Sequence, residues 1–262
     1  MGEPVLYAAE GGVAEIRFNR PEVLNAFDGA SVERFLAAVD RALSDPGVRV
    51  VLLTGEGRAF MAGGDVRSFH EAADRPAFVA RRIGPLHAGL LRLAQAPAIT
   101  VAAAQGAVAG AGLSLFAGAD LGLLADDAVL STAYLRLGVS PDCGGTHALV
   151  RLLGERRAMA LALLSEAVTA EEALRIGLAN RVVPAAALRE EARALARRIA
   201  AGPAEALART KALIRGAATR GLARQLDAEA ESFVALAGTA DFAEGVAAFV
   251  ARRAPRFGGG GR

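Results

Sequence analysis

The sequence predicts an α/β fold in which parallel strands alternate with helices, followed by a helical C-terminal region. From residue 48 onward, short apolar runs typical of buried strands alternate with segments of helical periodicity. Beyond residue 145, helical patterns dominate the chain. We therefore expect an α/β core over residues 1–198 and a C-terminal helical region over residues 199–262, with a flexible glycine-rich tail at its end.

The first fifty residues predict a β-hairpin and a helix. Two strand-like runs, 5–9 and 13–18, flank the turn signal Gly11-Gly12. Asp28 stands where a helix N-cap is expected, and apolar residues follow it at helical spacing. These apolar residues are Val32, Phe35, Leu36, Val39 and Leu43.

The remaining elements follow from apolar runs, helical spacing and the glycine or proline residues between them. The runs that we expect to form strands are 48–54, 98–104, 120–125, 128–132 and 182–183. In the core, helical patterns cover 66–73, 78–93, 110–117, 146–153, 155–164, 169–176 and 185–200. In the C-terminal region they cover 203–217, 222–237 and 240–252.

Composition and charge exclude several classes of function. The net charge is +2 and no block of basic residues is interleaved with aromatic residues, so we expect no nucleic-acid partner. The single cysteine, Cys143, excludes a disulfide framework and, with no visible signal peptide, indicates a cytoplasmic protein. Residues 93–119 carry no charged side chain, but Pro97 and Gly106 interrupt them. We therefore expect buried core there and no membrane partner.

Two clusters of small residues each follow a predicted buried strand. Residues 62–64 follow the strand at 48–54, and residues 110–112 follow the strand at 98–104 and open a short helix. Small residues let a backbone approach a ligand closely, and a helix N-terminus carries unpaired N–H groups. Two such groups aimed at one carbonyl oxygen make an oxyanion hole. Close packing of a helix against a strand would by itself explain the second cluster.

These clusters belong to a series of short motifs that resembles the crotonase (enoyl-CoA hydratase/isomerase) family. The resemblance runs almost end to end, and the order and spacing of the motifs make it specific. Within the family, the chain is most similar to the enoyl-CoA isomerases of phenylacetate breakdown. The motifs are Asn19-Arg20-Pro21, Leu24-Asn25-Ala26, Ala59 to Asp65, Gly106, Gly110-Ala111-Gly112, Pro141 to Thr146, Ala170 to Ala173, Gly177 to Val183, Glu244-Gly245-Val246, Phe249 and Arg252-Arg253.

The resemblance implies a crotonase-like spiral of ββα units, with a C-terminal helical region that makes trimers or dimers of trimers. It implies an acyl-CoA thioester as substrate, with coenzyme A present as part of that substrate and no other cofactor. The thioester carbonyl would lie between the backbone N–H groups of Gly64 and Ala111. The family usually has glycine at the second position, but the donor is a backbone group, so an alanine there keeps it.

The same resemblance places the coenzyme A moiety at two groups of residues. The adenine pocket would be lined near Ala26, Ala62, Asp65 and Val66. In the C-terminal region, Phe249 and Arg252 would reach the coenzyme A of a neighbouring subunit. No metal is implied, and His70-Glu71 is not followed by a second histidine at metal-binding spacing.

The chain departs from the family's hydratases at two positions of the expected substrate pocket. Those hydratases carry two glutamates, and the matching residues here are Ser114 and Tyr134. Adding water needs one group to activate the water and another to deliver a proton. Serine has no basic group, and tyrosine has a reference pKa of about 10. Ordinary hydratase chemistry therefore lacks its usual groups, and Tyr134 would either hydrogen-bond the acyl part or close the pocket.

One candidate base remains in the family's pattern. Asp142 matches an aspartate that some isomerases of the family use, and a single carboxylate suffices to move a proton from C2 to C4 of a 3-enoyl thioester. The alternative is that Asp142 follows Pro141 only as a turn residue or helix cap.

These residues support three hypotheses about function. The first is an acyl-CoA isomerase that shifts a double bond, or performs a related ring isomerisation, through an enolate held in the oxyanion hole. The second is another enolate reaction of the family, including hydration with a base other than glutamate. The third is a non-catalytic acyl-CoA binder.

Overall fold

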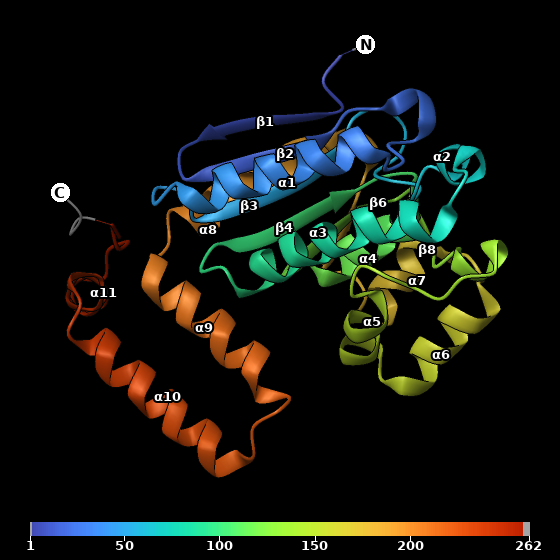
Figure 1. Ribbon diagram of the computed structural model, residues 1–262. Coiled ribbons are helices and arrows are strands. Elements are labelled where there is room, and N and C mark those ends of the chain that lie inside the picture. Colours follow the sequence, from blue (N-terminus) through green and yellow to red (C-terminus); the bar gives the residue numbers. More distant parts are fainter. Residues whose placement is uncertain (1, 259–262) are drawn as a thin grey trace.

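A six-stranded sheet forms the centre of the protein in the computed structural model, which describes residues 2–258 (Figure 1). The strand order is β1-β2-β3-β4-β6-β9. The predicted hairpin is antiparallel, and the later strands are all parallel to their neighbours, as expected from the alternation of strands and helices. The strands are β1 (Val5–Glu10), β2 (Val13–Phe18), β3 (Val50–Gly55), β4 (Ile99–Ala104), β6 (Leu121–Ala125) and β9 (Arg181–Val183).

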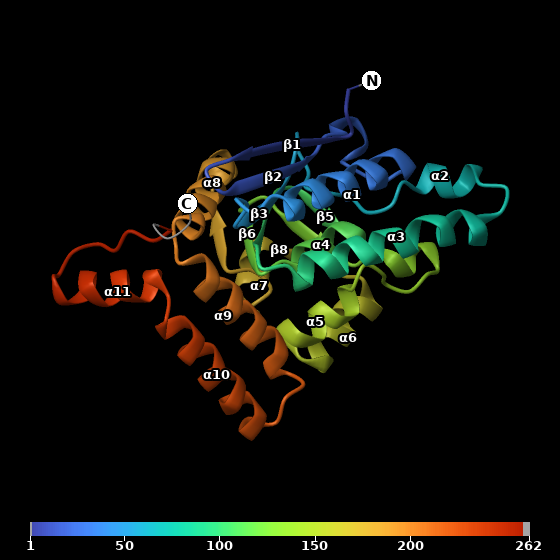
Figure 2. The ribbon, with the colours of Figure 1, turned by 60° about the vertical axis from the view of Figure 1, so that its left-hand side comes forward.

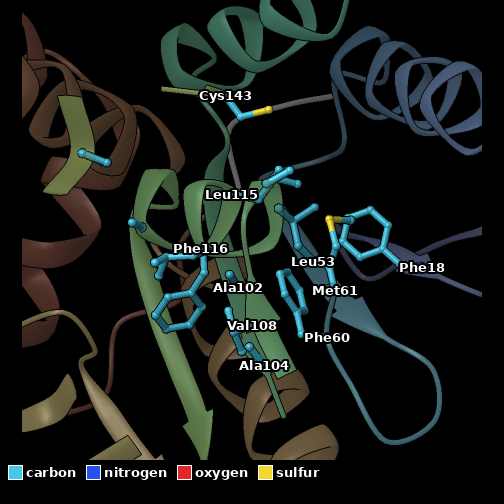
Figure 3. Close-up of a cluster of buried hydrophobic side chains, with 14 of the residues drawn as sticks. Phe18, Leu53, Phe60, Met61, Ala102, Ala104, Val108, Leu115, Phe116 and Cys143 are labelled. Atoms are coloured by element: carbon cyan, nitrogen blue, oxygen red, sulfur yellow. The ribbon is translucent and has the colours of Figure 1, made fainter. Parts of the chain in front are cut away.

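Helices cover both faces of this sheet, so that the fold has three layers. Because successive side chains of a strand point to opposite faces, Val51 and Leu53 of β3 join one buried cluster while Val50 and Leu52 join another. The helices α1 (Gly29–Ser44), α3 (Arg75–Gln95) and α4 (Ala111–Gly118) contribute to the first cluster, and α8 (Leu188–Ala200) closes the second. Figure 3 shows part of the first cluster, with Phe60, Met61, Val108 and Phe116 packed together.

A second, three-stranded sheet lies beyond the carboxyl end of the first. Its strands are β5 (Ala107–Ala109), β7 (Val129–Ser131) and β8 (Val168–Thr169). Sequence patterns predict β7 only, because β5 and β8 are too short to show periodicity. Helix α7 (Ala170–Arg175) packs against this sheet. The remaining helical elements are α2 (Val66–Glu71), α5 (Gly145–Leu153), α6 (Glu155–Leu164) and the 3₁₀ turns η1 (Pro21–Val23), η2 (Tyr134–Leu137) and η3 (Ala185–Ala187).

Three helices form the C-terminal region and project from one end of the core (Figures 1 and 2). They are α9 (Ala204–Ala217), α10 (Leu222–Ala237) and α11 (Ala240–Val250). The only lysine, Lys211, fixes α9 to the core, because its buried ammonium contacts Asp120 at 2.9 Å and donates to the Ala98 carbonyl at 2.8 Å. Burial lowers the pKa of Lys211, and the Asp120 carboxylate opposes that effect.

Much of the apolar surface of the C-terminal helices has no cover within the chain. Phe249 is 85% exposed, and Phe233, Val234 and Val250 are also exposed. None of the described helices is by itself long and apolar enough to cross a membrane, and α10 and α11 pass such a test only as a pair bent by 80°.

The expected α/β core with a helical C-terminal region is present, and the local corrections are small. Asp28 caps α1 as expected and shares a capping box with Ser31. Pro76 lies in the first turn of α3, so this helix begins at residue 75 and not at 78. The expected division at 198/199 falls within the last turn of α8 and stays a prediction. Residues 259–261 of the expected flexible tail lie outside the described residues.

Candidate active site

A buried asparagine holds the first glycine cluster in place. Asn25 has a positive φ of 58°, and its side-chain amide donates to the carbonyls of Glu56 and Ala59 at 2.9 and 2.8 Å. Two backbone bonds then fasten the neighbouring chain, from Ala62 N–H to the Leu24 carbonyl and from Phe27 N–H to the Gly63 carbonyl. The motif around Asn25 therefore acts as a template for residues 59–65.

The two glycine clusters lie side by side because their preceding segments pair. Phe60 N–H donates to Gln105, Met61 N–H donates to Ala107, and Ala109 N–H donates back to the Met61 carbonyl. This pairing needs glycine at position 112, because a Cβ there would lie 2.3 Å from the Met61 carbonyl oxygen. It is the close backbone approach for which small residues are suited.

The expected oxyanion donors come from the two sides of this pairing. A Cβ on Gly63 would lie 3.6 Å from the Ala111 nitrogen, so the loop before Gly64 lies against the first turn of α4. Among the hydrogen bonds of residues 2–258, none is donated by the backbone N–H of Gly64 or of Ala111. Ala111 is the first residue of α4, where backbone N–H groups have no partner within the helix.

A hydrogen-bonded chain connects the other three expected site residues. The Tyr134 hydroxyl donates to Asp142 Oδ1 at 2.5 Å and lies 3.1 Å from Ser114 Oγ. Because a carboxylate can only accept, the phenolic proton lies toward Asp142, and Ser114 is the donor to the phenol. The short distance is typical of a hydrogen bond to a charged carboxylate. The structure thus joins Asp142 to α4, one turn along that helix from Ala111.

The surroundings of Tyr134 keep its phenol protonated. Burial is the largest cause that raises its pKa well above the usual range, and the negative charge of Asp142 adds to it. The contact with Ser114 acts in the opposite direction but is weaker. Neither role expected for Tyr134, binding the acyl part or closing the pocket, includes this bond to Asp142.

Sequence patterns do not point to His87, which lies beside Asp142. Its Nε2 accepts the backbone N–H of Cys143 at 3.1 Å, although the two residues are 56 positions apart in the chain. His147, which is near Asp142 in sequence, is exposed on α5. No spacing rule links a histidine in the middle of α3 to the turn before α5, so only the fold brings them together.

His87, Asp142 and Cys143 form a cluster of potential metal ligands. In the described part of the chain, their nitrogen, oxygen and sulfur ligand atoms lie within 4.8 Å of one another. Burial and the nearby Asp142 charge raise the pKa of the Cys143 thiol well above its usual range. The three donors of this cluster are fewer than the four that a structural zinc site uses, and Cys143 is a buried side chain of the turn.

The four residues expected near the adenine come together around Arg20. Its guanidinium donates to the Ala26 carbonyl at 2.6 Å and lies 3.4 Å from Asp65, while Ala62 is bonded to the same loop. Val66 follows on α2 with half of its surface exposed. Helix α11, which contains Phe249 and is followed by Arg252, lies far from α2, so the described chain does not bring these two residues to the site (Figure 2).

Comparison with known proteins agrees with this geometry. The model of the enoyl-CoA hydratase/isomerase family matches residues 8–260. The chain belongs to this family. Membership confirms the resemblance carried by the glycine clusters and identifies the chain as an enzyme of the enoyl-CoA hydratase/isomerase type, and an acyl-CoA substrate is consistent with this family.

Relatives within the family differ in the reaction that their names give. The chain is 39% identical to the 1,2-epoxyphenylacetyl-CoA isomerase of Escherichia coli, with 99% of this chain and 100% of that protein aligned. It is 32% identical to the trans-2-decenoyl-[acyl-carrier-protein] isomerase of Streptococcus mutans over 97% and 98% of the two chains. A solved enoyl-CoA hydratase from Polaromonas matches with a TM-score of 0.90 and 32% identity over 97% and 99% of the two chains.

Replacing Gly112 by alanine tests the pairing of the two glycine clusters. The new Cβ would overlap the Met61 carbonyl, and we expect the free energy of unfolding to fall by about 1–3 kcal/mol, as for other overpacked interiors. Turnover of enoyl-CoA substrates should fall more than their binding. Gly118→Ala in the same helix is the control, since nothing lies within 4 Å of that position. Urea unfolding and steady-state kinetics measure both effects, and equal behaviour of the two variants would contradict the prediction.

Tyr134 offers an optical test of its bond to Asp142. The chain has two tyrosines, so a Tyr7→Phe background isolates Tyr134. Its absorbance at 295 nm should show no ionisation near pH 10 in the native protein, when read by rapid mixing before alkaline unfolding. Adding Asp142→Asn should lower the pKa of Tyr134, because one cause of the rise is removed while burial remains. A native phenol that ionises near pH 10 would disprove the assignment.

The raised pKa of Tyr134 also determines how the stability of the folded protein changes with pH. The folded protein keeps the phenol protonated where the unfolded chain ionises. The contribution of Tyr134 is therefore present below about pH 10 and is lost as the pH rises above it.

Proposed function

We propose that this enzyme isomerises enoyl-CoA thioesters by moving a double bond, with Asp142 as the base. The observation that carries the proposal is the arrangement of one carboxylate, Asp142, tied through Tyr134 and Ser114 to the helix that begins with the oxyanion donor Ala111. Ser114 and Tyr134 stand at the two positions that hold glutamates in hydratases of the family. Their two hydroxyl groups are hydrogen-bonded to each other.

The reaction needs one proton transfer out and one back. Asp142 removes a proton from C2 of a 3-enoyl thioester, and the electron pair of that C–H bond moves into a dienolate whose negative charge lies on the thioester oxygen. The N–H groups of Gly64 and Ala111 hydrogen-bond that oxygen. Asp142 then returns the proton to C4, which leaves the 2-enoyl thioester and an ionised carboxylate. Loss of one oxyanion donor costs about 3–4 kcal/mol in other enzymes, so the two donors supply a large part of the stabilisation.

The bond from Tyr134 assigns separate tasks to the two oxygens of Asp142. Oδ1 accepts the hydrogen bond of the phenol, and the proposal assigns to Oδ2 the uptake of the substrate proton. The raised pKa of Tyr134 keeps the phenol a donor throughout the neutral range. A base held in one orientation gains from proximity, because less motion must be frozen out to reach the transition state.

Hydration is the second candidate, and a name among the compared structures favours it. The Polaromonas protein is described as an enoyl-CoA hydratase. In this chain, hydration requires Asp142 to activate water and a second group to deliver a proton. Tyr134 is a poor donor to a substrate, because its proton is committed to Asp142. Non-catalytic binding of acyl-CoA is the third candidate, and the assay below separates all three.

A paired assay with Asp142→Asn tests the function. We expect the wild type to convert a 3-enoyl-CoA into the 2-enoyl-CoA, and to add no water to the 2-enoyl-CoA. Asparagine cannot take up the proton, so turnover should fall by about a thousandfold or more, while binding of the acyl-CoA changes little. Glu33→Gln, which removes an exposed carboxylate on α1, is the control and should keep full activity.

Three other outcomes would each change the assignment. Water addition by both the wild type and Asp142→Asn would favour hydration with another base. Isomerisation that survives in the variant would remove Asp142 from the mechanism. Acyl-CoA binding without turnover in either protein would favour the binder.

We also propose that the enzyme works in the cytoplasm as a homotrimer or a dimer of trimers. The exposed apolar side chains of α10 and α11 support such an assembly, because a surface of that kind is normally covered by a partner. In this assembly, Phe249 and Arg252 of one subunit would reach the coenzyme A bound to a neighbouring subunit. The adenine pocket that holds this coenzyme A would be lined by Ala26, Ala62, Asp65 and Val66 of the neighbouring subunit.

Sedimentation velocity tests the assembly. We expect a trimer or a hexamer for the wild type. Phe233→Asp and Val234→Asp together should give smaller species, because burying two charges at an interface is costly. Glu33→Gln should keep the wild-type mass. A monomeric wild type at micromolar concentration would contradict the proposal.

A further inference from the structure

The turn that carries Asp142 has an unusual backbone. Cys143 and Gly144 follow one another in the left-handed region, with φ of 53° and 75°. Residues other than glycine, asparagine and aspartate rarely adopt this backbone conformation. Contacts with the surrounding structure must therefore stabilise the backbone of Cys143. Helix α5 begins directly after it, and Gly144, the N-cap residue, has no side chain to cap that helix.

The buried side chain of Cys143 and a small number of hydrogen bonds hold this turn. The carbonyl of Asp142 accepts the Gly145 N–H at 3.0 Å, and the carboxylate of Asp142 accepts the Tyr134 hydroxyl. The N–H of Cys143, at the residue with the left-handed backbone, finds its acceptor on a distant helix, in the imidazole of His87. Because Cys143 donates to Nε2, that nitrogen carries the lone pair and Nδ1 carries the proton.

We infer that His87 is a positioning residue for the reaction, because its Nε2 fixes the Cys143 amide and thereby the orientation of the Asp142 carboxylate. This inference rests on the proposed function for its catalytic consequence. Asp142 is held from two sides: Tyr134 fixes one carboxylate oxygen, and His87 fixes the backbone one residue later. Loss of either contact leaves the base in the site but lets it leave the orientation suited to proton transfer.

His87 also links the turn to α3, a helix that is packed against α1 and the core. The neighbouring residue Leu86 is buried in the first core cluster, and a Cβ on Gly89 would overlap the Leu36 side chain of α1. The backbone around His87 is therefore fixed by α1 and the sheet. The imidazole itself is exposed, so replacing it leaves the core intact. The hydrogen bond between His87 and Cys143 therefore ties the turn to the fixed backbone of α3.

Two variants separate the acceptor from the bulk of the side chain. His87→Leu removes the acceptor, whereas His87→Gln offers an amide oxygen to the Cys143 N–H. His147→Gln is the matched control, because His147 is also an exposed histidine close to the turn and is not a partner of Cys143. Thermal unfolding checks that all three variants fold.

The reactivity of Cys143 gives a readout that does not depend on catalysis. It is the only cysteine in the chain, and it is buried with a raised thiol pKa, so 5,5′-dithiobis(2-nitrobenzoic acid) should modify the native protein slowly. We expect His87→Leu to react about fivefold to tenfold faster, the size of effect expected from losing one hydrogen bond. His87→Gln and His147→Gln should react at nearly the wild-type rate.

Kinetics on a 3-enoyl-CoA give the second readout. His87→Leu should lower kcat about tenfold with little change in KM, since the oxyanion donors and the coenzyme A pocket are untouched. His87→Gln should recover most of that loss, which a side chain with a merely structural role would not do. Unchanged thiol reactivity together with unchanged kcat in His87→Leu would overturn the inference, as would a loss that glutamine does not recover.

The two readouts keep the inference separate from the proposed function. If the wild type isomerises no enoyl-CoA, the proposed function fails, and thiol reactivity alone decides whether His87 holds the turn. If the wild type is active and Asp142→Asn is inactive, the function stands whatever the His87 variants show.

Discussion

The backbone pairing of Phe60 and Met61 with residues 105–109 is the contact on which the rest of the site depends. It brings together two loops that follow different strands of the main sheet, and it sets the first turn of α4 against the loop that ends at Gly64. Among the described residues, the N–H groups of Gly64 and Ala111 donate no hydrogen bond, and they come from opposite sides of one junction. A side chain at position 112 would separate the two loops, so the junction needs a small residue there.

The second organising feature is the hydrogen-bonded connection from α4 to Asp142. Ser114 and Tyr134 stand at the two positions where the family resemblance places the glutamates of hydratases, and together they engage a carboxylate on a third segment. The resulting chain of hydroxyl groups restrains the Asp142 carboxylate without supplying a second carboxylate. A catalyst with one carboxylate can move a proton between two carbons. Adding water needs two groups, one to activate the water and one to deliver a proton.

A site of this kind uses rigid elements for precision and loops for chemistry. Asn25 and Arg20 fasten the loop at one side, and α3 supports the turn of Asp142 at the other. The C-terminal helices are fixed differently, since Lys211 and Arg215 both reach Asp120 at the end of the sheet. Lys211 also donates to the Leu93 carbonyl of α3 at 3.2 Å, so the region that exposes apolar surface is tied to the helix that supports the turn.

The sequence by itself determined the alternation of strands and helices, both glycine clusters, the candidate base and the family. These features are local, because periodicity, turn residues and short motifs depend on residues close together in the chain. The sequence alone therefore predicts them. The hairpin, the cap at Asp28 and the strand at 50–55 match expectation for that reason.

Only the tertiary structure decided how the site is assembled. The strands β5 and β8 are too short to show a pattern, and they exist because a neighbouring strand pairs with them. Tyr134 reaches Asp142, and His87 reaches Cys143, through contacts across different elements. Such contacts depend on the directions in which helices and turns project their side chains, and the packing of the whole core fixes those directions. No local pattern of residues encodes them.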